Sequence, residues 1–167
     1  MLEIITRNIA VKVIEDNLDH LIRFAFFRLG DMSKAEDVVH EAVLRLLDHP
    51  PSLFKPGSLK SYLYRIVYNL CQDSIREDSR QIRLPIESVE NREEESEEVL
   101  DMKEAQRISR LLENIPTKES EIIRMSVVDD LSFAEISRIT KIPESTVKYR
   151  YKCGISKLRD LLSINNN

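Results

Sequence analysis

Side chains that can hydrogen-bond to DNA are concentrated in one short segment near the C-terminus, residues 145–152. Lysine and arginine suit phosphates and guanine edges, and a threonine can contact a phosphate or a thymine methyl group. The preceding run SFAEISRITKIP (132–143) predicts a short helix and a turn, so the next helix would enter the major groove by its N-terminal turns. An ordinary solvated helix face in a small bundle is the alternative. The predicted DNA contacts are Ser145, Thr146, Lys148, Tyr149, Arg150 and Lys152.

The composition indicates an all-α protein. The 167 residues include three glycines and six prolines, and 32% of them are charged. A many-stranded sheet needs many tight turns, and so few glycines do not favour them. Leucine, isoleucine and charged residues instead recur at helical spacing. At this length the chain can bury a core of modest size as one domain or as two small ones.

Apolar periodicity predicts three helices in the N-terminal half of the chain. They cover about residues 4–29, 33–49 and 59–79 and are separated by Gly30 and by a proline-containing loop over 48–58. We expect Ser33 to cap the second helix, because Glu36 three residues later completes the capping-box pattern.

In the C-terminal half the pattern predicts a helix over 99–112, a helix capped by Thr117, and the two helices of a helix-turn-helix. Ser132 and Glu135 form a second predicted capping box. The last helix has an apolar stripe at steps of three or four, which predicts its buried face: Val147, Tyr151, Ile155, Leu158 and Leu162.

Charge is distributed unevenly, although the net charge is only −4. Residues 1–80 carry 11 basic and 12 acidic side chains, residues 81–104 carry 3 and 9, and residues 105–167 carry 11 and 8. The segment QIRLPIESVENREEESEEVLDMKE (81–104) is therefore predicted to be an acidic linker between an N-terminal domain, 1–80, and a C-terminal domain, 105–167. An exposed acidic helix from about residue 88 is the alternative. Because the net charge is small and negative, the electrostatic field of the protein argues against tight DNA binding by the free chain.

The sequence lacks clustered metal ligands and catalytic groups. Cys71 and Cys153 stand alone, and His20, His40 and His49 are scattered, so no metal site and no cofactor is predicted. No nucleophile–base pair or phosphate-binding loop is found, which predicts that the protein is not an enzyme. No signal-peptide pattern and no run of roughly 18 apolar residues is present, so we expect a cytoplasmic protein without membrane insertion.

Two further motifs occur, one in each half of the chain. The run AEDVVHEAVLRLL (35–47), followed after a loop by SYLYRIVYNL (61–70), resembles region 2 of sigma-70 family RNA polymerase sigma factors of the extracytoplasmic-function group. The stretch from Ile115 and Pro116 through LSFAEI (131–136) and STVKYR (145–150) to KLR (157–159) resembles their region 4. Both motifs occur in family order with the acidic segment between them.

This resemblance implies a transcription initiation factor. Region 2 would bind the clamp coiled coil of the RNA polymerase β′ subunit and melt the promoter −10 element, while region 4 would read the −35 element and touch the β flap. A cognate anti-sigma factor is implied as a further partner. Read without the family, the first motif is only the solvated face of an amphipathic helix. The implied core polymerase contacts are Asp37, His40, Glu41, Leu44 and Arg45.

The resemblance also assigns the −10 element to the second helix of region 2 and to the loop before it. Unpaired bases need stacking faces, edge readers and phosphate contacts, and this helix mixes aromatic, amide and basic side chains. Core packing with an outward hydroxyl is the alternative role for its tyrosines, in particular for Tyr62 and Tyr68. The implied contacts are Phe54, Lys55, Ser58, Tyr62, Asn69, Asp73, Arg76 and Arg80.

The sequence departs from the family pattern near its C-terminus. Lys141 stands where the family often has glycine, and Cys153 and Ile155 stand where it commonly has arginines. The missing arginines predict −35 binding that is weaker or directed at a different sequence. For Cys153, a small apolar packing residue and a redox switch are the two alternatives.

The predicted function is that of an alternative sigma factor, which binds core RNA polymerase and directs it to a restricted set of promoters. Two other functions stay open on the sequence alone. One is a helix-turn-helix repressor or activator that binds duplex DNA as a dimer without polymerase. The other is an adaptor or decoy that binds polymerase or an anti-sigma factor without opening DNA.

Overall fold

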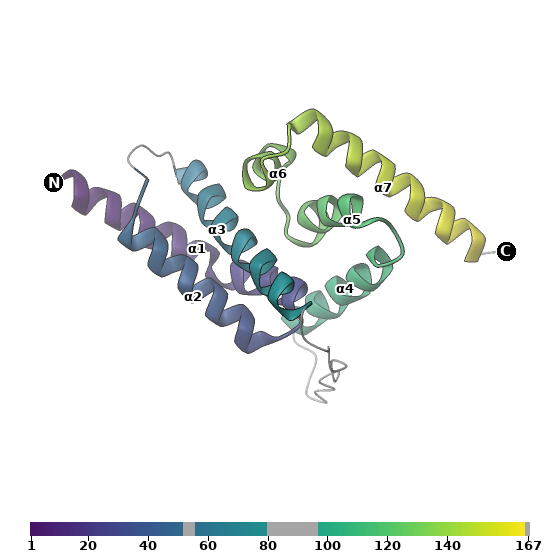
Figure 1. Cartoon of the computed structure of the whole chain (residues 1–167), viewed down its shortest axis with the longest axis horizontal. Coiled ribbons are helices and arrows are strands. Elements are labelled where there is room, and N and C mark those ends of the chain that lie inside the picture. The colour runs from purple at the N-terminus through teal and green to yellow at the C-terminus, as the bar shows by residue number, and fades with distance from the viewer. Residues whose placement is uncertain (52–55, 80–96, 166–167) are drawn as a thin grey trace. The chain divides into compact units, whose positions relative to one another are not determined.

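The computed structural model describes residues 1–51, 56–79 and 97–165 (Figure 1). These residues form α-helices and one short π-helix, and no strand occurs among them. The all-α class predicted from the composition is therefore confirmed. The chain divides into two compact units, Met1–Glu87 and Ser88–Asn167. None of the helices in the described ranges is long and apolar enough to cross a membrane.

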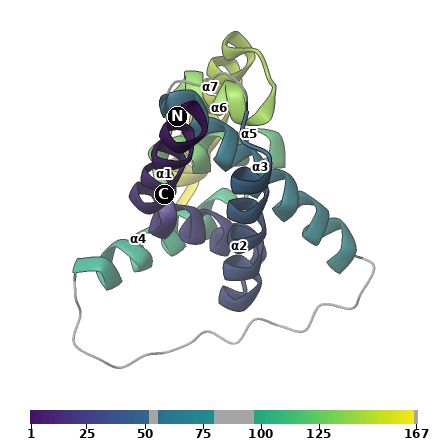
Figure 2. The same cartoon turned by 90° about the vertical axis from the view of Figure 1, so that its left-hand side faces the viewer.

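The first unit is built from three helices, α1 (Leu2–Leu29), α2 (Met32–Asp48) and α3 (Pro56–Asp78), and each packs against the other two. Figure 2 shows α2 with α1 on one side and α3 on the other. Each helix buries one stripe of apolar side chains, so the core lies between all three helices. The most deeply buried of these side chains are Leu21, Phe24, Leu46, Leu59, Leu63 and Tyr64.

The corner between α1 and α2 is made by Gly30 and Asp31. Gly30 has φ 70°, the left-handed conformation that favours glycine, and its N–H donates to the carbonyl of Phe26 at 2.8 Å. Asp31 is extended and caps α2 by accepting a hydrogen bond from the backbone N–H of Lys34 at 3.0 Å. The prediction that Ser33 caps this helix is wrong, because the left-handed Gly30 ends α1 so early that Ser33 already lies in the first turn of α2.

The second unit contains α4 (Glu97–Leu112), α5 (Thr117–Ile123), a π-helical segment η1 (Arg124–Val128), α6 (Phe133–Thr140) and α7 (Glu144–Asn165). α7 packs against both α5 and α6, and α4 packs against η1. α4 begins inside the segment predicted to be a linker, so residues 97–104 of that segment are helical. Residues 80–96 lie outside the described residues, so the domain boundaries stay a prediction.

The core of the second unit joins α4, α5 and α7. Leu112, Ile115, Ile123 and Leu158 are buried together, and partly buried side chains that include Tyr151, Ile155 and Leu161 pack against them. The predicted stripe of α7 is confirmed at Val147, Tyr151, Ile155 and Leu158. It is wrong at its last position, because Leu162 is 47% exposed and Leu161 packs inward instead.

Two predicted caps in this unit have different outcomes. α5 begins at Thr117 with Pro116 before it, so the hydroxyl of Thr117 lies inside the first turn and the prediction that Thr117 caps the helix is wrong. The capping box at α6 is confirmed: Glu135 N–H donates to the Ser132 hydroxyl at 3.1 Å, and Ser132 N–H donates to the Glu135 carboxylate at 2.8 Å.

Candidate nucleic-acid and polymerase interfaces

α6 and α7 are joined by a three-residue turn that is held by hydrogen bonds. Lys141 has φ 62° and ends α6, and its N–H donates to the carbonyl of Ser137 at 2.9 Å. The hydroxyl of Ser137 donates to the carbonyl of Ile142 at 2.6 Å, so the turn is tied back to α6. At the other end, the carbonyl of Pro143 accepts from the backbone N–H groups of Thr146 and Val147 at 2.9 and 3.0 Å. These bonds fix where α7 begins.

The first turns of α7 present polar side chains opposite a buried face. Val147 is fully buried, and the rings of Phe133 and Tyr151 meet edge to face with centroids 5.1 Å apart. At 3.6 residues per turn, the exposed residues fall within about 100° of one another around the helix axis. Ser145, Lys148, Tyr149 and Lys152 are exposed, while Thr146 and Arg150 are half-buried at the edge of this stripe.

Ion pairs and hydrogen bonds link residues along the exposed side of α7. Lys148 Nζ lies 3.4 Å from Glu144 Oε1, and both side chains are about half exposed. A hydrogen bond with Cys153 raises the pKa of Tyr149 above its ordinary value. Further along, Lys157 Nζ donates to Glu119 Oε1 of α5 at 2.7 Å, and this hydrogen bond raises the pKa of Lys157.

The two positions where the family commonly has arginine have different surroundings. Ile155 lies two turns after Lys148 at the border of the exposed stripe, and its partly buried side chain packs against the core of the second unit. Cys153 is half-buried beside Tyr149. At one of the two positions, therefore, a packing residue stands in place of an arginine.

α3 presents a second polar stripe, in the first unit. Five of the predicted −10 contacts recur at spacings that place them within about 60° of one another around the helix. All five are exposed: Ser58, Tyr62, Asn69, Asp73 and Arg76. Arg76 lies 3.6 Å from Asp73 in an ion pair that leaves both side chains mostly exposed. The other three predicted contacts, Phe54, Lys55 and Arg80, lie outside the described residues.

The tyrosines of α3 do not share one environment. Tyr62 is 38% exposed, whereas Tyr64 is fully buried and its ring meets that of Phe24 edge to face at 5.3 Å. Tyr68 is half-buried. Tyr64 therefore packs in the core, whereas Tyr62 is partly exposed.

The outer face of α2 carries all five residues predicted to contact polymerase. Asp37, His40, Glu41, Leu44 and Arg45 are exposed, opposite the buried stripe of Ala35, Val39, Ala42 and Leu46. Arg45 Nε donates to Glu41 Oε1 at 2.7 Å, one helical turn apart. Leu44 is 51% exposed among these charged neighbours. The face combines charge with an apolar contact point, a mixture found in protein–protein interfaces.

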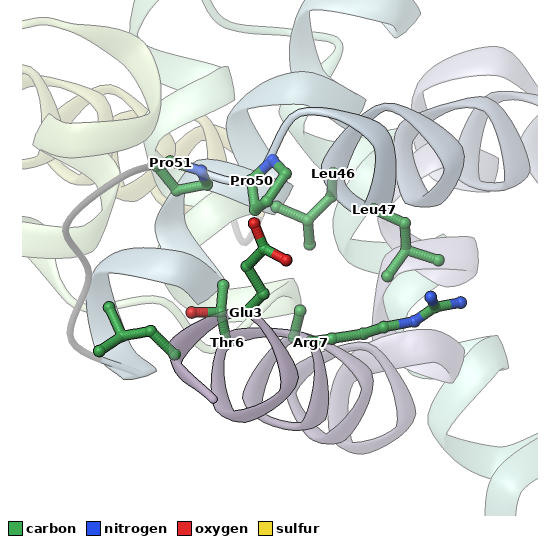
Figure 3. Close-up of a pocket in the computed structure, with 9 residues that line it drawn as sticks. Glu3, Thr6, Arg7, Leu46, Leu47, Pro50 and Pro51 are labelled. Carbon is green, nitrogen blue, oxygen red and sulfur yellow. The ribbon is translucent and has the colours of Figure 1, made fainter.

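A pocket of about 330 Å³ lies between the N-terminal turns of α1 and the C-terminal end of α2. Figure 3 shows Glu3 reaching from α1 towards Pro50, and Arg7 extending below Leu47. None of the residues predicted for DNA or polymerase contact lines this pocket. Among the described residues, no three His, Cys, Asp or Glu side chains are grouped so that they could hold a metal ion.

Comparison with known proteins matches each unit to a described protein family. Residues 13–81, which include α2 and α3, match the family described as Sigma-70 region 2, and residues 105–158, which include α6 and most of α7, match Sigma-70, region 4. This chain belongs to the sigma-70 family. Both matches occur in family order, and the three helix faces described above, on α2, α3 and α7, fall inside them. The resemblance found in the sequence is thereby confirmed.

Curated relatives place this sigma factor in the extracytoplasmic-function group. It is 28% identical over 156 residues to the ECF RNA polymerase sigma factor SigW of Bacillus subtilis, which covers 86% of this chain and 83% of the relative. It is 27% identical over 158 residues to the RNA polymerase sigma factor SigV of the same organism, covering 92% and 91%. The chain is an alternative sigma factor that directs promoter-specific transcription, as the sequence predicted.

Solved structures share the fold of this sigma factor. CnrH in complex with the cytosolic domain of CnrY has a TM-score of 0.65 and 18% identity, covering 95% of this chain and 97% of that one. The sigma factor RpoE in complex with the anti-sigma factor NepR, from Bartonella quintana, has a TM-score of 0.58 and 18% identity, covering 90% and 94%.

Two residues near the region 4 face are absent from the sequence-based predictions. Glu144 opens α7 and pairs with Lys148. The signal for it in the sequence is an acidic residue four positions before the first of the predicted basic residues. Gly154 lies where α7 approaches α5: a Cβ added there would come 2.5 Å from Ile123 Cδ1 and 3.0 Å from Glu119 Cβ. Nothing in the local sequence marks this contact, because its partner lies about thirty residues earlier.

Proposed function

We propose that this sigma factor reads the −35 element with α7, holds the melted −10 element on α3 and binds core polymerase through α2. One observation supports all three assignments: each of these helices buries one stripe and exposes a second stripe whose chemistry suits the assigned partner. The −35 and −10 stripes lie in the segments matched to region 4 and region 2, respectively.

At the −35 element, α7 would enter the major groove by its first two turns. Lys148 and Lys152 can donate to phosphates or to guanine edges, and Ser145 and Thr146 can hydrogen-bond to phosphates near the helix N-terminus. The hydrogen-bonded turn after α6 keeps these side chains in register. Arg150 at the edge of the stripe suits a phosphate of the groove wall.

At the −10 element, α3 would hold unpaired bases of one strand. Tyr62 offers a ring for stacking, Asn69 offers an amide that can both donate and accept, and Arg76 offers a cation for a phosphate. Asp73 beside Arg76 orients that guanidinium or accepts from a base amine. Phe54, Lys55 and Arg80 remain contacts proposed from the resemblance alone.

On the polymerase, the α2 face would bind the clamp coiled coil of the β′ subunit. Leu44 supplies an apolar anchor, and the surrounding charges supply specificity. The second unit would contact the β flap while α7 lies on DNA. Because polymerase then holds both DNA-binding units, two weak contacts act as one bivalent contact, and a net charge of −4 is compatible with promoter binding.

An anti-sigma factor would be a further partner of this chain. Two structural relatives were solved as complexes, one with the cytosolic domain of CnrY and one with the anti-sigma factor NepR. We place the action of the chain in the cytoplasm, where polymerase and promoters are found. It would contribute binding energy rather than covalent chemistry, so it would act as an initiation factor and not as an enzyme.

Substitutions on α7 and on α2 test whether the two helices contact different partners. The double variant Lys148→Ala, Arg150→Ala should lower initiation from promoters with a −35 element about 10-fold or more, because two charged DNA contacts are lost, while core binding is unchanged. Leu44→Asp should weaken binding to core instead, with Leu18→Asp on the exposed side of α1 as its matched control. Core binding is measured by competition with a labelled chain, and initiation by run-off transcription. Loss of core binding in the α7 variant would contradict the assignment of α7.

A further inference from the structure

An acidic side chain stands at the tip of the helix that faces DNA in the proposed function. Glu144 is the first residue of α7 and is exposed. Its carboxylate lies 3.4 Å from the ammonium group of Lys148, one turn further along the same side of the helix. DNA phosphates are negative and can only accept hydrogen bonds, so this carboxylate has no favourable partner on the DNA backbone.

The backbone at this tip is held in place, so the point from which the Glu144 side chain leaves the helix is fixed. The residues before and after it are tied down: Ile142 accepts from the Ser137 hydroxyl at 2.6 Å, and Pro143 accepts from Thr146 and Val147. Val147 is buried in the core of the unit. A side chain on a fixed first turn can approach the same base pair each time the helix enters the groove.

Major-groove chemistry leaves two donors for a carboxylate, cytosine N4 and adenine N6. Adenine presents the N7 acceptor beside N6, which repels a carboxylate, so cytosine is the better partner. The guanine paired with cytosine presents the O6 and N7 acceptors. Glu144 and Lys148 place an acceptor and a donor side by side in the same way. The pair is therefore complementary to the groove edge of a C·G base pair, and it mismatches the acceptor O4 and methyl group of thymine.

We propose that Glu144 is a specificity-determining residue that accepts a hydrogen bond from cytosine N4 of one C·G pair in the −35 element, while Lys148 donates to the guanine of that pair. This proposal rests on the proposed function of α7 as the −35 reader. A carboxylate in the first turn also stabilises its own helix through the helix dipole and the i,i+4 ion pair. That effect is independent of the DNA sequence, so a base preference separates the two roles.

The test uses holoenzyme assembled from core polymerase and the full chain. Run-off transcription is carried out on a template library with a randomised −35 region and a constant −10 region, and the templates of the transcripts are sequenced. Glu144→Ala and Glu144→Gln are compared with the unsubstituted chain. Asp160→Asn, an exposed residue further along α7, serves as the matched control for loss of one negative charge.

We expect the unsubstituted chain to enrich C·G at one position of the library. Glu144→Ala should lose that preference about 10-fold or more, and Glu144→Gln should shift it towards A·T, because a carboxamide pairs with adenine N6 and N7. Preferences at the other positions should not change. Core binding should match the unsubstituted chain, and the unfolding temperature should fall only slightly, because the first-turn charge and its ion pair are lost. The isosteric Glu144→Gln variant decides the question if the alanine variant folds poorly.

Two results would overturn the proposal, and only one of them would also contradict the −35 role of α7. If both variants keep the original base preferences and only raise initiation on all templates alike, Glu144 is not a base reader and the −35 role of α7 stands. If the unsubstituted chain shows no preference anywhere in the randomised region, the −35 role of α7 fails as well.

Discussion

At the scale of single residues, two tyrosines of α3 show how one residue type takes two roles. Tyr64 points into the three-helix core against Phe24, while Tyr62, two positions earlier, is 38% exposed on the proposed −10 stripe. A helix turns about 200° over two residues, so the two rings must face nearly opposite sides. Loss of the Tyr64 ring would lower the stability of the first unit, whereas loss of the Tyr62 ring would weaken binding of the unpaired −10 strand.

Asn69 gives the residue-scale prediction. It is exposed on the same stripe, so Asn69→Ala should leave the fold intact and remove one edge-reading group. We expect open-complex formation to slow about 3- to 10-fold, the cost of one hydrogen bond, with little change in closed-complex binding. Permanganate reactivity of unpaired thymines measures opening, and filter binding at low temperature measures the closed complex.

Asn8→Ala is the matched control for Asn69→Ala. Asn8 is exposed on α1, in the same unit and outside the α3 stripe, so its loss should leave opening unchanged. An unchanged rate of melting in Asn69→Ala would remove this residue from the −10 interface.

At the scale of elements, the turn between α6 and α7 contains a strained residue. Lys141 has φ 62°, a left-handed conformation that costs a residue with a Cβ about 1–2 kcal/mol. Lys141→Gly should therefore stabilise the second unit by about 0.5–1 kcal/mol, after the greater freedom of glycine in the unfolded chain is subtracted. Urea unfolding read by hydrogen exchange of α6 and α7 amides measures this change.

Arg138→Gly is the control for this substitution. Arg138 is exposed inside α6, so glycine there should destabilise the unit by about 1 kcal/mol. The opposite signs of the two glycine substitutions are the test: a loss of stability in Lys141→Gly would mean that the lysine side chain contributes more than its backbone strain costs.

Gly154 gives a second prediction at this scale. α7 and α5 approach so closely that a Cβ at this position would lie 2.5 Å from Ile123 Cδ1. Gly154→Leu should destabilise the second unit by about 1–3 kcal/mol, because the side chain has no room and the helices must separate. Ser156→Leu, at an exposed site on the same helix, should change the stability much less. Equal unfolding midpoints for the two variants would contradict the close packing.

The helices and their exposed faces were predictable from the sequence because a period of 3.6 residues determines both. All five α2 residues and the five described α3 residues of the predicted interfaces proved to be exposed at the expected spacing. The capping box of α6 was predictable because Ser132 and Glu135 are local to each other. Periodicity alone places Tyr64 on the side opposite Tyr62, but the contact of its ring with Phe24 of another helix could not be predicted from it.

Other features depend on backbone conformation or on distant contacts. Ser33 and Asp31 both suit an N-cap, and only the left-handed turn at Gly30 decides between them. From the local sequence alone, Gly154 is only a weak helix former. A glycine is needed there because Ile123 of α5 lies too close to leave room for a Cβ. The sequence shows Glu144 only as an acidic residue in the first turn of a helix, and its ion pair with Lys148 became evident from the structure.

At the scale of the whole molecule, the chain combines two compact units, one matching region 2 and one matching region 4. Neither the charge of −4 nor the exposed stripes would give strong DNA binding by the free chain. Polymerase would supply the affinity that the chain lacks, which limits its binding to promoters where both elements are correctly spaced.

Run-off transcription with purified bacterial core polymerase on a fragmented genomic library, with and without this chain, tests the central claim most directly. We predict discrete new start sites, each preceded by a shared pair of elements at constant spacing. If the chain binds core but no new start site appears, it is a decoy that occupies polymerase without opening DNA. If it does not bind core at all, its assignment as an initiation factor is contradicted.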